Sequence, residues 1–122
     1  MKYAVLSFDD GRADTYENAY KILRKYSLTA TINAVTDFIA RPERYSDFAS
    51  GGNKAMTAEQ LSECQKNGIE IACHGATHQN TADDILRNIR EFQNMGISTE
   101  DIGFASPNSY VTETTCSDIR AL

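Results

Sequence analysis

Residues 3–11 read YAVLSFDDG, a short apolar run that stops at two acidic residues and a glycine. A compact run of this length, bounded by a turn signal, predicts a buried strand over residues 3–8. The acidic pair then stands where that strand ends, and Gly11 allows the chain to turn sharply away. The segment therefore predicts the first strand of a sheet, with two carboxylates at its C-terminal end.

The rest of the chain alternates between helix-like and strand-like stretches. The further predicted strands span residues 29–35, 69–73 and 103–105, and the predicted helices span residues 14–26, 57–67, 81–96 and 114–122. Thr57 followed by Gln60 is a capping-box pattern, and Gly68 is well placed to end that helix. Strands that alternate with helices predict parallel pairing through crossover connections, and hence an α/β sheet or barrel.

Apolar stripes mark two of these helices, whereas residues 37–55 show none. The expected buried positions are Ala19, Ile22, Leu23 and Tyr26 in the first helix and Ile85, Leu86, Ile89 and Phe92 in the third. Residues 37–55 contain Pro42 and a Ser-Gly-Gly-Asn run, which indicates a long surface loop with at most a helical turn. The loop also carries aromatic residues that we expect to pack it onto the domain; they are Phe38, Tyr45 and Phe48.

The bulk composition limits the classes of function. A chain of 122 residues is one domain or a piece of one, and no stretch approaches the roughly 20 apolar residues of a membrane span. The net charge of −5 disfavours a partner made of nucleic acid. The start resembles no signal peptide, which predicts a cytoplasmic location unless a leader is missing from this sequence. The cysteines are three in number with no CxxC spacing, so we expect free, largely buried thiols.

Asp9 and Asp10 form the first cluster of chemically useful residues. Neighbouring side chains on an extended chain point to different sides, so one carboxylate can face a metal ion while the other faces the reacting water. The alternative is an ordinary Asp-Gly turn with two solvated acids. Taken alone, the pair does not decide between these two interpretations.

The second cluster is His74-Gly75-Ala76-Thr77-His78, directly after the predicted strand at 69–73. Imidazole is a good ligand for zinc, although two histidines can also serve as packing or surface residues. Both clusters follow parallel strands, so we expect them at one rim of the sheet. One carboxylate and two imidazoles would leave an open coordination position, which is typical of a catalytic rather than a structural zinc site. The spare carboxylate could then accept a proton from the attacking water.

These segments resemble the motifs of the polysaccharide deacetylases that carry a NodB homology domain, carbohydrate esterase family four. SFDDG at 7–11 is similar to the first motif. HGATH at 74–78 is similar to the second, with Gly75 in place of a hydroxyl residue, and FASPNSY at 104–110 is similar to the third. The separation of about 65 residues between the first two motifs also fits the family. The resemblance implies a partial distorted (β/α) barrel, with residues 1–122 as the N-terminal portion of one domain.

By this resemblance the chain would remove N-acetyl groups from amino sugars in a glycan. Asp9 would be the catalytic base, and Asp10, His74 and His78 would bind a divalent metal ion, with zinc the first expectation. The third motif would contact the substrate or its oxyanion through Pro107, Asn108 and Tyr110, and the partner would be an acetylated carbohydrate. The aromatic residues of the 37–55 loop could then stack on sugar rings, as the alternative to packing the loop onto the domain. Thr77 would orient His78 or a neighbouring backbone group.

Three departures from the family pattern keep two alternatives open. Ala105 stands where the third motif often has an arginine that orients the base, and Asn108-Ser109 replaces an aromatic-glycine pair. The family's later general-acid histidine has no counterpart, because the chain's two histidines are both assigned to the metal. The alternatives are a catalytically incompetent relative that binds metal or glycan, and a fragment whose partner chain, such as a second copy, completes the sheet.

Overall fold

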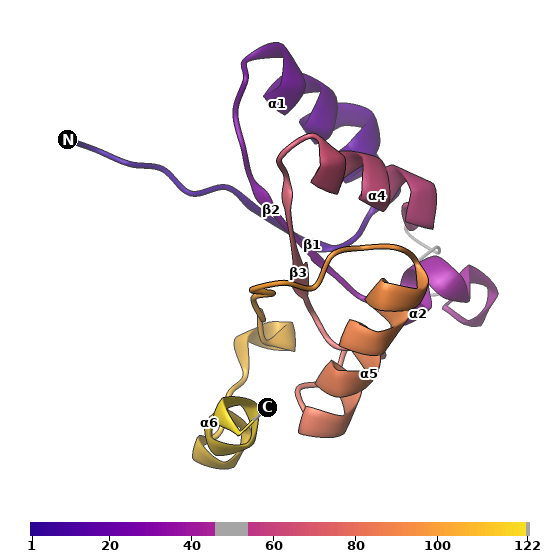
Figure 1. Cartoon of the computed structure of the whole chain (residues 1–122), viewed down its shortest axis with the longest axis vertical. Coiled ribbons are helices and arrows are strands. Elements are labelled where there is room, and N and C mark those ends of the chain that lie inside the picture. The colour runs from indigo at the N-terminus through magenta and orange to yellow at the C-terminus, as the bar shows by residue number, and fades with distance from the viewer. Residues whose placement is uncertain (46–53, 122) are drawn as a thin grey trace.

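Three parallel strands form the centre of the computed structural model, which describes residues 1–45 and 54–121 (Figure 1). The strands, in spatial order, are β1 (Ser7–Asp10), β2 (Thr31–Ala34) and β3 (Glu70–Cys73). Ala34 lies beside Asp10 on one side and beside Cys73 on the other, so all three strands end at the same edge of the sheet. The predicted α/β organisation with parallel strands is confirmed.

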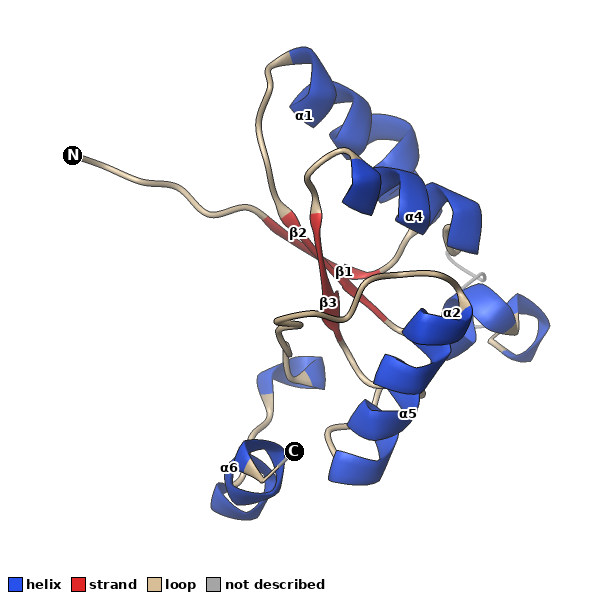
Figure 2. Ribbon diagram, in the orientation of Figure 1, coloured by secondary structure: helices blue, strands red, loops and turns tan. Residues whose placement is uncertain are grey.

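Helices follow the strands and pack in two groups around the sheet (Figure 2). In chain order they are η1 (Thr15–Tyr20), α1 (Lys21–Lys25), α2 (Thr36–Ala40), η2 (Pro42–Arg44), α4 (Ala58–Lys66), α5 (Ala82–Asn94), η3 (Pro107–Ser109) and α6 (Glu113–Arg120). Helices α1 and α4 lie together above the sheet as drawn, α2 and α5 lie together below it, and α6 stands apart (Figure 1). The predicted capping box at the start of α4 is present, because Thr57 and Gln60 exchange side-chain to backbone hydrogen bonds.

The apolar core lies between the sheet and its helices. Its largest fully buried side chains include Ile32, Met56, Leu61 and Phe92. The three cysteines are free, as the sequence predicts: Cys64 and Cys73 are buried and Cys116 is half-buried. No helix within residues 1–45 and 54–121 has the length and apolar character to cross a bilayer.

The first strand differs from its prediction. Pairing with β2 begins at Ser7, and the preceding residues are exposed, with 85% of Tyr3 and 87% of Val5 accessible. The reason is position: β1 is an edge strand with β2 on one side, and no described element covers the residues before Ser7. The described strands thus form an open three-stranded sheet and not a closed barrel.

Two predicted apolar stripes are also partly wrong. In the helix that follows β1, Ile22 and Tyr26 are exposed, and the buried side chains include Tyr20 and Leu23. This helix begins as the π-helix η1, whose wider turn rotates the buried face away from the position that a uniform 3.6-residue period predicts. In α5, Leu86 is 38% exposed although its predicted companions are buried or packed against the core.

Residues 37–45 are more ordered than the predicted surface loop. They contain most of α2 and all of η2, and Phe38 is buried with its ring edge-on to Tyr45 at 4.7 Å between centroids. Packing rather than sugar stacking therefore explains Phe38, while Phe48 lies outside the described residues. The predicted strand at 103–105 is reduced to one parallel bridge, between Cys73 and Phe104.

Helices α2 and α5 are joined by charged side chains. Arg41 and Arg87 each pair with both Asp37 and Glu91, and we call these four residues the acid–arginine network. The Asp37 side chain is only 5% exposed, so its charge depends on these partners and on the Tyr45 hydroxyl, which donates to it at 2.8 Å. The network fixes α2 against α5, and the Asp37 N–H donates to Ala76 O in the histidine segment.

Candidate metal centre

Asp10 and His74 reach the same edge of the sheet from the two outer strands. Asp10 is the last residue of β1, where its φ of +73° turns the chain, and His74 directly follows β3. Adjacent strands lie about 4.8 Å apart, so β1 and β3 are separated by about 10 Å. Ala34, at the end of β2, lies between them, so the two side chains must reach across the end of the middle strand to meet.

The structure brings Asp10, His74 and His78 together. One potential ligand atom from each lies within 4.8 Å of the others. Asp10 Oδ1 is 3.7 Å from His74 Nε2 and 3.5 Å from His78 Nε2. These separations exceed the usual N–H···O hydrogen-bond length of about 3 Å. Ligands about 2.0–2.1 Å from a tetrahedral zinc ion stand about 3.4 Å from one another, so the three side chains fit a shared divalent ion.

His74 is oriented by two distant segments. Its side chain is 4% exposed, and its Nδ1 lies 2.9 Å from Ala105 O. A carbonyl only accepts, so Nδ1 carries the proton and Nε2 is left with the lone pair that a metal requires. The His74 backbone N–H donates to Oδ1 of the fully buried Asn88 at 3.0 Å. Asn88 in turn donates to the Thr36 hydroxyl at 3.1 Å.

His78 has an unusual backbone conformation and surroundings that lower the pKa of its imidazole. Its φ is +62°, a left-handed value that needs support from neighbouring contacts. Burial lowers the pKa of His78, the nearby His74 lowers it further, and the carboxylate of Asp10 opposes both. Because the net direction is downward, the neutral imidazole, which is the form that binds metals, is favoured.

Asp84 at the start of α5 clamps the histidine segment. Its carboxylate accepts hydrogen bonds from the backbone N–H and the hydroxyl of Thr77 and from the N–H of Gln79. The Thr77 hydroxyl thus bonds to Asp84 and supports the loop, not the His78 ring. Gly75 passes under this clamp at φ +78°, where a Cβ would lie 2.3 Å from Gln79 O and 2.6 Å from Asp84 Oδ2. The packing around Gly75 explains why a larger hydroxyl residue is absent there.

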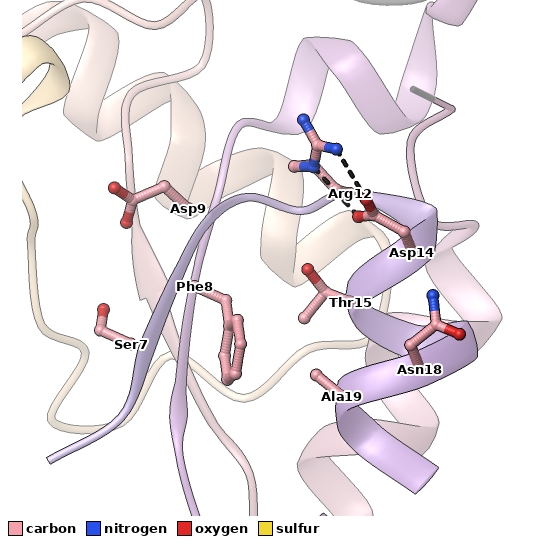
Figure 3. A pocket seen from close by; sticks show the side chains of 8 residues that line it. All are labelled: Ser7, Phe8, Asp9, Arg12, Asp14, Thr15, Asn18 and Ala19. Atoms are coloured by element: carbon pink, nitrogen blue, oxygen red, sulfur yellow. Dashed lines mark hydrogen bonds and ion pairs between the residues drawn. The ribbon is translucent and has the colours of Figure 1, made fainter. Parts of the chain in front are cut away.

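Asp9 lies beside Asp10, His74 and His78 but is not one of the three converging residues. Figure 3 shows Ser7 and Asp9 on one side of β1 and Phe8 on the other, at a surface hollow along the strand. The Asp9 carboxylate accepts a hydrogen bond from Asn33 Nδ2 at 2.7 Å. Asp9 is exposed to solvent, so one of the two adjacent acids joins the histidines while the other stays accessible.

The residues of the third motif are placed less directly. Pro107 is buried, Asn108 is exposed with φ +56°, and Tyr110 is 65% exposed. The segment is tied to the site through Ala105 O and through Tyr110 O, which accepts from Asn80 Nδ2. Among the described residues, none of these three contacts Asp10, His74 or His78, so their substrate role stays a prediction.

Sequence reasoning did not find three supporting residues: Asn33, Asp84 and Asn88. Asn33 lies within the predicted strand at 29–35 and Asp84 within the predicted helix at 81–96, and neither local pattern indicates a contact with the site. The available signal was a polar residue within an apolar pattern, at Asn33 in β2 and at Asn88 among the apolar positions of α5.

Comparison with known proteins identifies this arrangement at the level of a family. The family model described as polysaccharide deacetylase matches residues 1–122. YxkH of Bacillus subtilis (strain 168), assigned as a polysaccharide deacetylase, is 34% identical over 77 residues, covering 63% of this chain and 24% of its own length.

Solved structures share the fold. The Streptococcus pyogenes deacetylase PplD, solved in complex with acetate, superposes with a TM-score of 0.77 at 24% identity, over 96% of this chain and 51% of that one. IcaB from Ammonifex degensii superposes with a TM-score of 0.78 at 20% identity, over 96% of this chain and 55% of that one. The chain thus spans about half the length of these structures and about a quarter of YxkH.

Proposed function

Because this chain belongs to the polysaccharide deacetylase family, we propose that it hydrolyses N-acetyl groups on the amino sugars of a glycan. The reaction would use a divalent metal ion, and zinc is the ion that we expect. One observation carries the proposal: Asp10, His74 and His78 converge, while the adjacent Asp9 stays outside their group and accessible. A protein that only bound metal would have no need of this second carboxylate.

Asp10, His74 and His78 would hold the ion. An ion with three protein ligands and an open position supplies Lewis acidity to the attacking water and to the acetyl carbonyl. The Ala105 carbonyl fixes the His74 tautomer, and the Asp84 clamp fixes the loop that carries His78. These contacts set the geometry before substrate arrives, which is the condition for efficient metal-assisted hydrolysis.

Asp9 would act as the general base. Its carboxylate would take one proton from water as the water oxygen bonds to the acetyl carbon. Asp9 would then return this proton to the nitrogen as the C–N bond breaks, which gives the free amine and acetic acid, which ionises to acetate. Pro107, Asn108 and Tyr110 would contact the substrate, with the backbone N–H near Asn108 donating to the oxyanion. Residues 1–122 would be the N-terminal portion of the deacetylase domain.

A second candidate function is a relative that binds metal or glycan without turnover. The observation that favours it is the histidine count: the chain has two, and both lie in the metal-binding group, so neither is available to protonate the leaving amine. Within residues 1–45 and 54–121, no strand pairs with the outer edge of β1, which fits the proposal that a second copy, or another chain, completes the sheet. A monomeric mass in solution, together with full activity, would contradict that proposal.

Acetate release tests the leading function. The protein with added Zn²⁺ or Co²⁺ should release acetate from acetylated chito-oligosaccharides. Asp9→Asn should lower the rate by about 10²–10⁴-fold, the usual contribution of a general base, while metal binding is retained. His74→Ala should abolish metal binding. The matched control is Asp101→Asn. Asp101 is an exposed acid far along the chain, and its left-handed backbone is one that asparagine also accepts.

The outcomes separate the candidates. Metal binding without acetate release would favour the non-catalytic relative. A chain that binds no divalent metal, and whose titration is unchanged by His74→Ala, would contradict both.

A further inference from the structure

Asn33 is a buried amide that stands between two apolar residues of β2. It lies in the middle of β2 between the buried Ile32 and Ala34, and it is 5% exposed. Burying an amide is unfavourable unless its hydrogen-bonding groups find partners. Its Nδ2 donates to Ser7 Oγ at 2.8 Å and to Asp9 Oδ1 at 2.7 Å, so both of its amide protons are directed at β1.

The register of the sheet makes this contact. Asp9 of β1 is the direct neighbour of Asn33 in β2, and Ser7 and Asp9 share one side of β1 (Figure 3). A bond of 2.7 Å to a carboxylate is at the short end for N–H donors, and bonds to charged acceptors are the stronger class. Asn33 therefore holds one carboxylate oxygen of Asp9 in place from a rigid strand.

This restraint matters because of what lies next to Asp9. Asp10 is the adjacent residue and belongs to the metal-binding group, whereas Asp9 does not. An unrestrained carboxylate beside a divalent ion would tend to join its ligands, since carboxylate oxygens bind such ions readily. A base that is bound to the ion loses the lone pair it needs to accept a proton.

We propose that Asn33 is a positioning residue that holds Asp9 out of the metal's coordination sphere, with its second oxygen left available for the attacking water. The inference rests on the proposed function for the role of Asp9, but the contact itself is independent of it. A purely structural interpretation, in which Asn33 only satisfies its own donors, predicts the same loss of stability on truncation but no change at the metal.

The test compares Asn33→Ala with Thr31→Val. Thr31 lies two residues earlier on the same side of β2, and its hydroxyl donates to Glu70 instead of to β1. With Co²⁺ as the probe, Asn33→Ala should change the visible absorption spectrum as Asp9 joins the ion, and should lower kcat about 10–100-fold with little change in KM. Thr31→Val should leave both readouts as in the unaltered protein. Asn33→Ser keeps a polar group but is too short to reach Asp9. It should give the same changes in spectrum and kcat, and it replaces Asn33→Ala in the test if the alanine variant does not fold.

A double variant isolates the cause. In an Asp9→Asn background, Asn33→Ala should leave the Co²⁺ spectrum unchanged, because no carboxylate is left to move. Identical spectra for Asn33→Ala, Asn33→Ser and the unaltered protein would overturn the proposal. If the unaltered protein binds Co²⁺ but releases no acetate, the proposed function fails while the spectra still decide the role of Asn33. If it binds no Co²⁺, both proposals fail.

Discussion

Replacing Gly75 with alanine should disrupt the loop that carries His78, whereas the same replacement at Gly96 should be mild. Both glycines have left-handed backbones, with φ +78° at Gly75 and +74° at Gly96. They differ in their surroundings. A Cβ on Gly75 would stand 2.3 Å from Gln79 O and 2.6 Å from Asp84 Oδ2, whereas a Cβ on Gly96 would meet no atom within 4 Å. The pair therefore separates backbone strain from steric conflict.

The expected magnitudes follow from these two terms. A left-handed backbone is about 1–2 kcal/mol less favourable for alanine than for glycine, and this applies at both positions. At Gly75 the methyl group adds an overpacking term of about 1–3 kcal/mol. If it displaces the Asp84 carboxylate, the loss of a part-buried hydrogen bond from Thr77 or Gln79 adds about 0.5–1.5 kcal/mol. We expect Gly75→Ala to lower the free energy of unfolding by about 3–6 kcal/mol, against a total of about 5–15 kcal/mol for a domain.

Urea unfolding of the metal-free variants measures the first effect, and competition with a chelating dye measures zinc affinity. Gly75→Ala should weaken zinc binding about 10–100-fold, the usual effect of losing the residues that orient a ligand. Gly96→Ala should leave the affinity unchanged, because Gly96 lies at the far end of α5. Equal losses of unfolding free energy in the two variants, with equal zinc affinities, would refute the claim that the clamp shapes the site.

Two further predictions concern acid stability and thiol reactivity. Burial raises the pKa of Glu91, but the Thr36 hydroxyl and the arginines of the acid–arginine network outweigh it, so the pKa lies below its usual 4.5. Ionised Glu91 stabilises the fold above about pH 4.5, and this stabilisation is lost as the pH falls through its lowered pKa. Glu91→Gln should therefore make the free energy of unfolding in urea less dependent on pH in the acid range. Burial also raises the pKa of Cys64 to about 11 and of Cys73 to about 12, so a disulfide reagent near neutral pH should label Cys116 alone until urea is added. An unchanged acid profile, or three equivalents of label in the native protein, would contradict these expectations.

The parts of the fold that the sequence predicts well are those decided locally. Thr57 and Gln60 predict the start of α4, because their mutual hydrogen bonds need no distant partner. The burial of residues before Ser7 depends on which element lies beside β1, and no local pattern contains that information. The rotated face of the helix after β1 depends on a π-helical turn that a uniform 3.6-residue period does not include.

The candidate site divides in the same way. The convergence of Asp10, His74 and His78 could be predicted from sequence, because parallel strands present their C-terminal ends at one edge. The residue types, one carboxylate and two imidazoles, indicate metal binding. Asn33 and Asp84 could not, because each acts through one hydrogen-bonding geometry across the fold. In the sequence, Gly75 is only a departure from a motif. The structure shows why a glycine is required there, because a Cβ would collide with Gln79 O.

One face of α5 connects these supporting contacts. Asp84, Asn88 and Glu91 recur at intervals of four and three residues, so they lie on the same side of the helix. Asp84 holds the loop of His78, Asn88 holds the backbone of His74, and Glu91 holds α2 through the acid–arginine network. The same helix buries Ile85 and Phe92 in the core, so a shift of α5 would move both histidines together. Metal affinity and the packing of α5 should therefore be coupled, and changes on this polar face should weaken metal binding even though none of its residues is among the three candidate ligands.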